Sequence, residues 1–399
     1  MKVFLLLLFT TSLFNKMWAQ NSLPVFCNNE VTVGAERFDV YLDKLIGQKI
    51  GLVGNQSSLV GRTHLVDTLL SQGVDLVKLF SPEHGFRGEA DAGEKVSSGI
   101  DQKTSLPIVS LYGSHKKPSP KDLEGIDVIL FDIQDVGARF YTYISSLHYV
   151  MEACQEEGVK LIVLDRPNPN GFYVDGPVLN MKYKSFIGMH PVPIVHGMSI
   201  GEYAQMINGE DWLGENSKAD LLVVPCLGWN HTKFYKLPTK PSPNLPNMLS
   251  VYLYPSLCLF EGTVVSVGRG TDWPFQIIGH PQFKNSQFSF IPEPNFGSKK
   301  PKLKGQECKG IDFIESGLSV MQNQHQIQLS WFMQFYNDLN LKEQFFLSNN
   351  FINLLAGSNT FKNYLINGLT EAEIRLTWEP ALSEFKIKRK HYLLYSDFD

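Results

Sequence analysis

A carboxyl group and an imidazole stand side by side in the segment Ser81-Pro-Glu-His-Gly-Phe86, between turn-forming residues. Such a pair can exchange protons near neutral pH when the surroundings tune the two pKa values, which is what general acid and base catalysis requires. Glu83 is therefore the candidate general acid, with His84 as its catalytic neighbour. The structural alternative is that Glu83 caps the following turn and His84 packs its ring.

The segment Asp132-Ile-Gln-Asp-Val-Gly-Ala-Arg139 combines carboxylates with a guanidinium, and tyrosines follow it. Arginine offers paired donors to a carboxylate, aromatic rings pack on the apolar faces of sugars, and carboxylates accept hydrogen bonds from hydroxyl groups. This combination predicts a site for a sugar or a carboxylate ligand. An Asp–Arg pair that stiffens the loop is an equally weighted alternative. The candidate residues are Asp132, Asp135, Arg139, Tyr141 and Tyr143.

Further candidates lie in loops rich in proline or glycine. The segment Asp165-Arg-Pro-Asn-Pro-Asn-Gly171 is either a ligand-contacting turn or a turn stiffened by its own prolines. Glycines on both sides of Arg269 allow the backbone to approach a ligand closely. Glu202 fits the third helical position of a capping box begun by Ser199, which would occupy its carboxylate. The predicted ligand contacts from these loops are Asp165, Arg166, Asn168, His196, Asn247, Glu261 and Arg269.

Short apolar runs rich in β-branched residues recur in the N-terminal half and are typical of buried parallel strands. Helical patterns alternate with them, at residues 63–70, after Ser119 and at residues 143–157. The alternation predicts an α/β fold with a Rossmann-like, doubly wound, mostly parallel sheet. The expected strands are residues 49–53, 75–80, 107–111, 128–132, 160–165 and 221–225.

The elements place the candidate residues at one edge of this sheet. In open α/β sheets, ligands bind outside the carboxyl ends of the strands. The segments that begin at Ser81, Asp132 and Asp165 each start where a predicted strand ends. We therefore expect them to converge and to form the site.

A second, smaller α+β domain is expected after residue 255, so that the domains are residues 30–255 and 256–399. The stretch 236–255 is rich in proline, asparagine and serine, which favours an irregular connection or a cleft-lining loop. Beyond it, residues 262–267 resemble a strand, and helical patterns follow at 329–341, 351–355 and 370–385. Thr370-Glu-Ala-Glu373 is a capping box for the last helix.

Composition narrows the function classes. The chain has 399 residues, a formal net charge of -4 and 43% hydrophobic residues, so nothing favours a nucleic-acid partner. Residues 1–19 combine one early positive charge with a short apolar run and predict a cleaved signal peptide. We therefore expect a secreted, periplasmic protein without a membrane anchor. Five widely spaced cysteines without a CxxC pair argue against a zinc or redox motif.

Several cofactor and nucleophile signatures are missing from the sequence. The first predicted strand leads into Gly54-Asn-Gln-Ser-Ser58, without GxGxxG or GxxxxGK[ST]. No GxSxG elbow and no HExxH are present. We therefore expect neither a nucleotide cofactor nor a metal.

Taken together, the segments 81–86, 131–143 and 164–169 resemble the NamZ-type exo-β-N-acetylmuramidases. The resemblance continues through His196-Gly-Met-Ser-Ile-Gly-Glu202, Pro241-Ser-Pro-Asn244, Glu261-Gly-Thr263 and Gly268-Arg-Gly-Thr271 to Tyr392-Leu-Leu-Tyr395, and so covers nearly the whole chain after the signal region. It implies a Rossmann-like domain and a smaller C-terminal domain with the active site between them. It also implies release of N-acetylmuramic acid from non-reducing ends of peptidoglycan fragments, with Glu83 as the catalytic residue.

Glycosidic cleavage usually needs a second carboxyl beside the acid. Asp132, Asp135, Glu89 and Glu261 are all candidates for that role. Muramic acid carries a lactyl carboxylate, and Arg139 or Arg269 is the expected partner. Two alternatives remain open at this point: a non-catalytic protein that binds wall fragments, and an esterase or amidase of wall components, although the latter lacks a nucleophile elbow.

Overall fold

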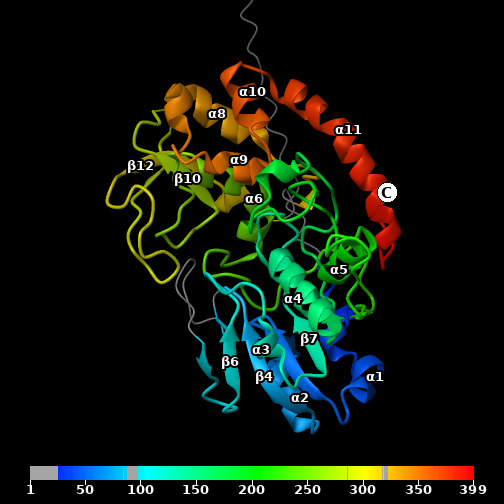
Figure 1. The fold of residues 1–399 in the computed structure, drawn as a ribbon. Helices are drawn as coiled ribbons and strands as arrows, with labels where there is room; N and C mark the ends of the chain where they lie inside the picture. The colour runs from blue at the N-terminus through cyan, green and yellow to red at the C-terminus, as the bar shows by residue number, and fades with distance from the viewer. Residues whose placement is uncertain (1–25, 84, 88–97, 285, 317, 319–321) are drawn as a thin grey trace, which may run out of the picture.

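The computed structural model describes residues 26–399, apart from 84, 88–97, 285, 317 and 319–321. In this part of the chain, seven strands form one sheet in the order β5-β6-β4-β1-β7-β8-β9 (Figure 1). All neighbours are parallel except β5, which pairs antiparallel with β6. The strands are β1 (Lys49–Gly54), β4 (Asp75–Ser81), β5 (Gly99–Ile100), β6 (Pro107–Ser110), β7 (Val128–Asp132), β8 (Lys160–Leu164) and β9 (Leu221–Val224).

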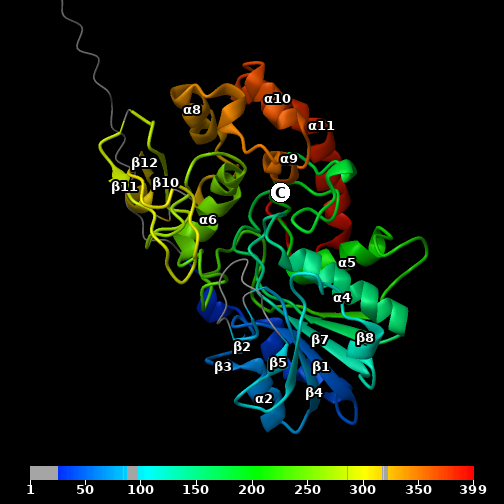
Figure 2. The same ribbon diagram turned by 60° about the vertical axis from the view of Figure 1, so that its left-hand side comes forward.

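The six parallel strands, counted along the described chain, have the spatial order 3-2-1-4-5-6 of a Rossmann fold. Every residue of β7 is buried, as is all of β1 beyond its first residue, because helices cover both faces of the sheet. Figure 2 shows α4 and α5 over one face and α2 beneath the other. The helices are α1 (Phe38–Tyr41), α2 (Leu65–Ser71), α3 (Pro120–Leu123), α4 (Tyr143–Glu157) and α5 (Ile200–Gly209), and β2 (Leu59–Val60) and β3 (Thr63–His64) form a separate hairpin. The predicted fold class is confirmed.

The C-terminal part combines a small antiparallel sheet with helices. Its sheet has the order β10-β12-β11, and its strands are β10 (Ile277–His280), β11 (Ser289–Phe290) and β12 (Cys308–Asp312). Its helices are α6 (Met248–Leu257), α8 (Leu329–Leu339), α9 (Phe351–Ala356), α10 (Thr360–Ile366) and α11 (Glu371–Arg389). Short 3-10 helices connect the elements of both parts: η1 (Asn28–Glu30), η2 (Gly34–Glu36), η3 (Leu42–Lys44), η4 (Met181–Tyr183), η5 (Cys258–Gly262), η6 (Ile314–Ser316), η7 (Lys342–Phe345) and η8 (Lys390–Tyr392).

The prediction that residues 236–255 are irregular is wrong for the last part of this stretch, where α6 begins at Met248. Asn247 caps this helix by accepting from the Ser250 N–H at 3.0 Å. Pro255 lies inside α6 and has no N–H to donate to the carbonyl of Val251. The side-chain amide of Asn170 donates to that carbonyl at 3.2 Å, so the proline is tolerated in a buried helix.

The strand predicted at 262–267 is also not formed. The chain makes only isolated bridges there, between Thr263 and Phe346 and between Ser266 and Gly279. The ammonium group of Lys302 donates to three carbonyls in this region, those of Phe260, Thr263 and Val265. A lysine therefore supplies hydrogen bonds that a neighbouring strand would have supplied.

One hydrophobic core runs through both parts of the described chain, and only Ile277, Phe290 and Cys308 form a separate small cluster. Helix α11 returns along the molecule toward α5 (Figure 1), beginning at the predicted capping box of Thr370 and Glu373. The five cysteines are free thiols. No helix in the described residues has the length and apolar character needed to cross a membrane. The predicted signal peptide lies outside the described residues.

Candidate active site

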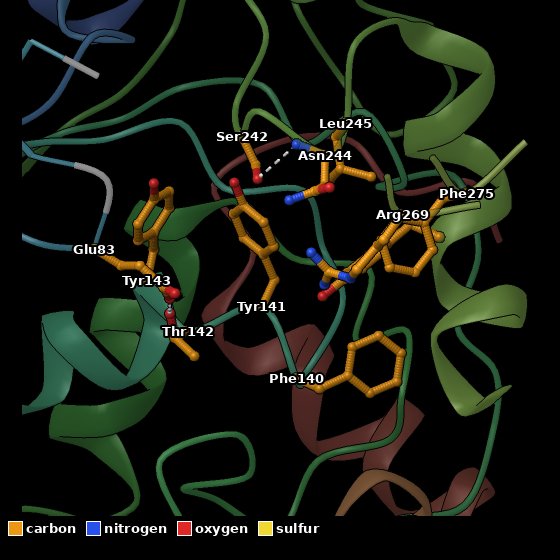
Figure 3. A pocket seen from close by; sticks show the side chains of 11 residues that line it. Glu83, Phe140, Tyr141, Thr142, Tyr143, Ser242, Asn244, Leu245, Arg269 and Phe275 are labelled. Carbon is orange, nitrogen blue, oxygen red and sulfur yellow. Dashed lines mark hydrogen bonds between the residues drawn. The ribbon is translucent and has the colours of Figure 1, made fainter. Parts of the chain in front are cut away.

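A pocket opens between the sheet edge and the C-terminal part of the chain (Figure 3). Its walls come from four regions: the turn after β4, the loop after β7, the proline-rich connection before α6, and α6 with the loop before β10. The pocket encloses about 440 Å³, part of which is open to solvent. The lining residues are Glu83, Phe140, Tyr141, Thr142, Tyr143, Ser242, Asn244, Leu245, Tyr254, Arg269 and Phe275.

Glu83 lies at one end of the pocket because β4 stops at Ser81 and the chain turns sharply. Gly85 adopts a φ of 82°, and its N–H donates to the Pro82 carbonyl at 3.3 Å. The half-buried Glu83 carboxyl accepts from the phenol of Tyr112 at 3.0 Å through Oε1 and from the hydroxyl of Thr142 at 3.4 Å through Oε2. The predicted neighbour His84, and the acids Glu89, Asp91 and Glu94, lie outside the described residues.

Tyr141 and Tyr143 form an aromatic wall of the pocket. Their ring centroids are 4.9 Å apart in an edge-to-face arrangement. Both phenols donate to the Pro241 carbonyl, at 2.8 and 3.5 Å. Burial raises the pKa of both phenols, so they remain neutral at physiological pH. Their hydroxyls hold the proline-rich connection, and their rings are left to contact a ligand.

Arg269 enters the pocket from the opposite side to Glu83, and Tyr141 stands between them (Figure 3). Its guanidinium makes two hydrogen bonds of 2.8 Å to Glu261 and lies 5.0 Å from the centre of the Phe275 ring. Burial lowers the pKa of Arg269, but the Glu261 carboxylate outweighs that effect and raises it above its usual value. The arginine side chain is 25% exposed, so a fixed positive charge faces the pocket.

The backbone around Arg269 requires the flanking glycines. Gly268 and Gly270 have φ values of 77° and 82°, in the left-handed region. A Cβ at Gly270 would come within 2.6 Å of the Glu293 carbonyl oxygen. These glycines therefore let the loop pack closely against neighbouring backbone, and this packing fixes the position of Arg269.

Asp132 and Arg166 do not line the pocket. They form a bidentate pair at 2.6 and 2.9 Å, with side chains 0% and 2% exposed. Asp165 is equally buried, and accepts from Ser199, Tyr395 and the N–H of Gly201. Asp132, Arg166 and Asp165 therefore make contacts inside the protein, as the structural alternative predicts. Because Asp132 does not reach the pocket, it is not placed for the predicted catalytic role.

Arg139 is also enclosed rather than exposed to the pocket. Its guanidinium donates to the carbonyls of Pro177 and Val192, both at 2.7 Å, and to that of Leu355 at 2.9 Å. Burial lowers its pKa to about 9. Because Leu355 belongs to α9, Arg139 joins the two parts of the chain and is not the arginine that faces a ligand.

Asp135 and His196 lie behind the pocket as a buried pair, 3.9 Å apart. Burial raises the pKa of Asp135 to about 7 and lowers that of His196 to about 3. Asn168 donates to the Met198 carbonyl at 2.9 Å. Asn247 is the α6 cap already described. None of these four side chains lines the pocket.

Glu202 has the predicted capping contact, accepting from the Ser199 N–H at 2.8 Å. Its other oxygen accepts from the N–H of Leu394 at 2.9 Å and lies 3.0 Å from a ring nitrogen of His231. The carboxylate is thus fully engaged in the fold.

Sequence reasoning missed several pocket residues. Ser242 and Asn244 lie in the segment Pro241-Ser-Pro-Asn244, which contributes to the family resemblance. Nothing in their residue types or spacing identified them as residues that line a binding pocket. Tyr112, which contacts Glu83 but does not line the pocket, lies two residues beyond β6 and could have been found by the strand-end argument that singled out Glu83. Tyr254 and Phe275 carry no signal beyond their aromatic character.

The crevice between β1 and β7, where a Rossmann sheet reverses its strand order, is filled by the chain's own polar residues. The hydroxyl of Ser57 accepts from the Gln134 N–H at 2.9 Å, and Ser58 donates to the Asp132 carbonyl. Asn55 donates to the phenol of Tyr143 at 2.9 Å. Among the described residues, no group of three or more His, Cys, Asp or Glu side chains could hold a metal ion.

Comparisons with known proteins point to one family. Family models described as exo-beta-N-acetylmuramidase NamZ match residues 50–249 with the N-terminal domain and residues 252–395 with the C-terminal domain. The chain is 38% identical over 390 residues to the peptidoglycan beta-N-acetylmuramidase NamZ of Bacillus subtilis, covering 89% of each chain.

Two crystal structures of DUF1343 family proteins from Bacteroides fragilis share the fold. One is 44% identical, with a TM-score of 0.85, and the other is 27% identical, with a TM-score of 0.77. In both cases the match covers 92% of this chain and 99% of the other.

Proposed function

The chain belongs to the exo-β-N-acetylmuramidase NamZ family and is a glycoside hydrolase, and we propose that it releases N-acetylmuramic acid from the non-reducing ends of peptidoglycan fragments. The observation that carries the proposal is the arrangement of the pocket. Glu83 and Arg269 face it from opposite ends, and an aromatic wall lies between them. A sugar bound in the pocket can therefore contact both groups: the Glu83 carboxyl at its glycosidic oxygen and the Arg269 cation at its acidic substituent.

Glu83 is the proposed general acid. It donates its proton to the leaving glycosidic oxygen while the bond from that oxygen to the sugar breaks toward an oxocarbenium-like transition state. Tyr141 and Tyr143 supply ring surfaces for the sugar, and their own hydroxyls stay on Pro241.

Arg269 is the proposed partner of the lactyl carboxylate, the group that distinguishes N-acetylmuramic acid from N-acetylglucosamine. Glu261 fixes the guanidinium through two of its nitrogens, Nε and Nη2. No acceptor in the described part of the chain bonds Nη1, and Figure 3 shows the guanidinium directed toward Tyr141 and Asn244. A planar guanidinium held in this way can still bind a carboxylate through its remaining N–H groups.

The test is turnover of a chromogenic muramyl glycoside by the wild-type protein and by Glu83→Gln. We expect release of the aglycone by the wild type and a loss of at least a hundredfold in Glu83→Gln, with substrate binding retained. Thr370→Ala, which removes a helix cap outside the pocket, is the control and should keep wild-type kcat. Binding without release by the wild type would indicate a wall-fragment binding protein instead.

Mass spectrometry of digested peptidoglycan fragments tests the bond that is cut. Loss of single muramyl residues from one end supports the proposal, whereas loss of peptides or acyl groups would indicate an amidase or esterase. We further propose that the protein acts outside the cytoplasm. Detecting it in the cytoplasmic fraction of its host alone would reject that part.

A further inference from the structure

Tyr112 reaches Glu83 through the pairing of two neighbouring strands. Ser81 at the end of β4 is in register with Ser110 at the end of β6, and the N–H of Leu111 donates to the Ser81 carbonyl at 2.8 Å. The parallel pairing thus extends one residue beyond β6. Tyr112, the next residue, is brought beside Glu83, which follows Ser81 by two positions.

The contact distinguishes the two oxygens of Glu83. Oε1 accepts from the phenol of Tyr112 at 3.0 Å, and Oε2 lies 3.4 Å from the hydroxyl of Thr142. Thr142 lines the pocket, whereas Tyr112 does not. Burial, with the neighbouring Glu83 carboxylate, raises the pKa of Tyr112, so its phenol keeps its proton and donates it to Oε1 in a hydrogen bond.

We infer that Tyr112 is a positioning residue that selects which oxygen of Glu83 delivers the catalytic proton. This inference rests on the proposed function of Glu83. Oε1 accepts the shorter of the two hydrogen bonds, 3.0 Å against 3.4 Å, so we place the proton on Oε2, the oxygen on the side of the pocket residue Thr142. When Oε2 gives its proton to the glycosidic oxygen and the sugar–oxygen bond breaks, Glu83 becomes a carboxylate, and the bond from Tyr112 strengthens because its acceptor is now charged.

Removal of the phenol changes how the rate depends on the leaving group. Without Tyr112, the negative charge that Glu83 acquires on giving up its proton is less stabilised. Proton transfer to a poor leaving group therefore becomes slower, whereas a good leaving group needs little protonation and is lost almost as fast. A merely structural role would lower activity equally for every leaving group.

The experiment compares wild type, Tyr112→Phe and Tyr392→Phe. Tyr392→Phe is the matched control, because it removes a 2.8 Å phenol–carboxylate hydrogen bond to Glu210, outside the pocket. For Tyr112→Phe we expect kcat to fall about tenfold on a muramyl disaccharide, but by less than about threefold on an aryl glycoside with an acidic phenol as leaving group. The control should match wild type on both substrates.

The outcomes separate the inference from the proposed function. Equal losses on both substrates overturn the role of Tyr112 and leave the role of Glu83 in place. Activity of Glu83→Gln equal to wild type on the disaccharide overturns the role of Glu83, and the inference with it. The ratio of the kcat values on the two substrates is independent of the amount of folded protein, so a partly unfolded Tyr112→Phe still gives a decisive result.

Discussion

Both carboxylate oxygens of Glu261 bind Arg269 at 2.8 Å, which fixes a guanidinium at the pocket wall opposite Glu83. If Arg269 recognises the lactyl carboxylate, Arg269→Ala should raise KM for muramyl substrates about 10- to 100-fold and leave glucosaminyl analogues nearly unchanged. Glu261→Gln should have a smaller effect in the same direction. Kinetics on paired muramyl and glucosaminyl glycosides measure this, and equal losses on both would rule the assignment out.

The buried pair of Asp132 and Arg166 predicts a loss of stability rather than of chemistry. Removing one partner leaves an uncompensated buried charge, so Asp132→Asn should cost about 3–5 kcal/mol of unfolding free energy. Glu30→Gln, which breaks the exposed pair with Lys233, is the control and should leave the unfolding free energy nearly unchanged, because solvent screens such a pair. Denaturant unfolding checks both. A stable Asp132→Asn protein without turnover would instead give Asp132 a catalytic role.

His148 predicts how stability depends on pH. It is buried and 3.0 Å from His190, and burial lowers its pKa to about 4. In the unfolded chain this histidine takes up a proton near pH 6.5, whereas in the folded protein it stays neutral down to about pH 4. Its neutral form therefore costs no stability above pH 6.5, and as pH falls from 6.5 to 4 the unfolding free energy drops by about 3 kcal/mol. The difference in unfolding free energy between pH 7 and pH 4.5 should be smaller for His148→Gln than for wild type.

The exposed His391 is the matched control for that measurement. His391→Gln should keep the wild-type dependence of stability on pH. If His148→Gln and wild type lose the same stability between the two pH values, the linkage to His148 is refuted.

Lys302 is expected to hold the loop that carries the pocket arginine. Replacing it in Lys302→Met leaves the carbonyls of Phe260, Thr263 and Val265 without these bonds and should lower the unfolding free energy by about 3 kcal/mol. Lys362→Met, at a half-buried lysine that donates one 3.3 Å hydrogen bond to Asn350, should have a much smaller effect. Thermal unfolding tests the pair, and similar values for the two variants would contradict the expectation.

The strands were predictable because parallel strands covered on both faces appear as continuous apolar runs, and β4, β7 and β8 begin at the predicted residues. Helix α4 matches its predicted range from Tyr143 to Glu157. By contrast, the backbone of residues 262–267 is determined by Lys302, which is distant in sequence, and a local pattern contains no information about such a donor.

The site was predictable only in part, for a similar reason. A strand end indicates which residues reach the sheet edge, and this was enough to find Glu83 and the tyrosines. It does not indicate whether a side chain turns toward the pocket or into the protein. Arg139 and Arg269 are both predicted as partners of the lactyl carboxylate, but Arg139 binds three backbone carbonyls, whereas Arg269 binds one carboxylate and faces the pocket.

The return of α11 to the N-terminal domain has a consequence for the order in which the protein folds. Tyr395 supplies a hydrogen bond to the buried Asp165, and Arg389 donates to the Gly197 carbonyl at 2.7 Å. A chain that ends at β9 lacks both donors. The Rossmann domain therefore completes its buried polar network only when residues 389–395 have docked on it, and truncation before Arg389 should yield a loosened domain that proteases cleave readily.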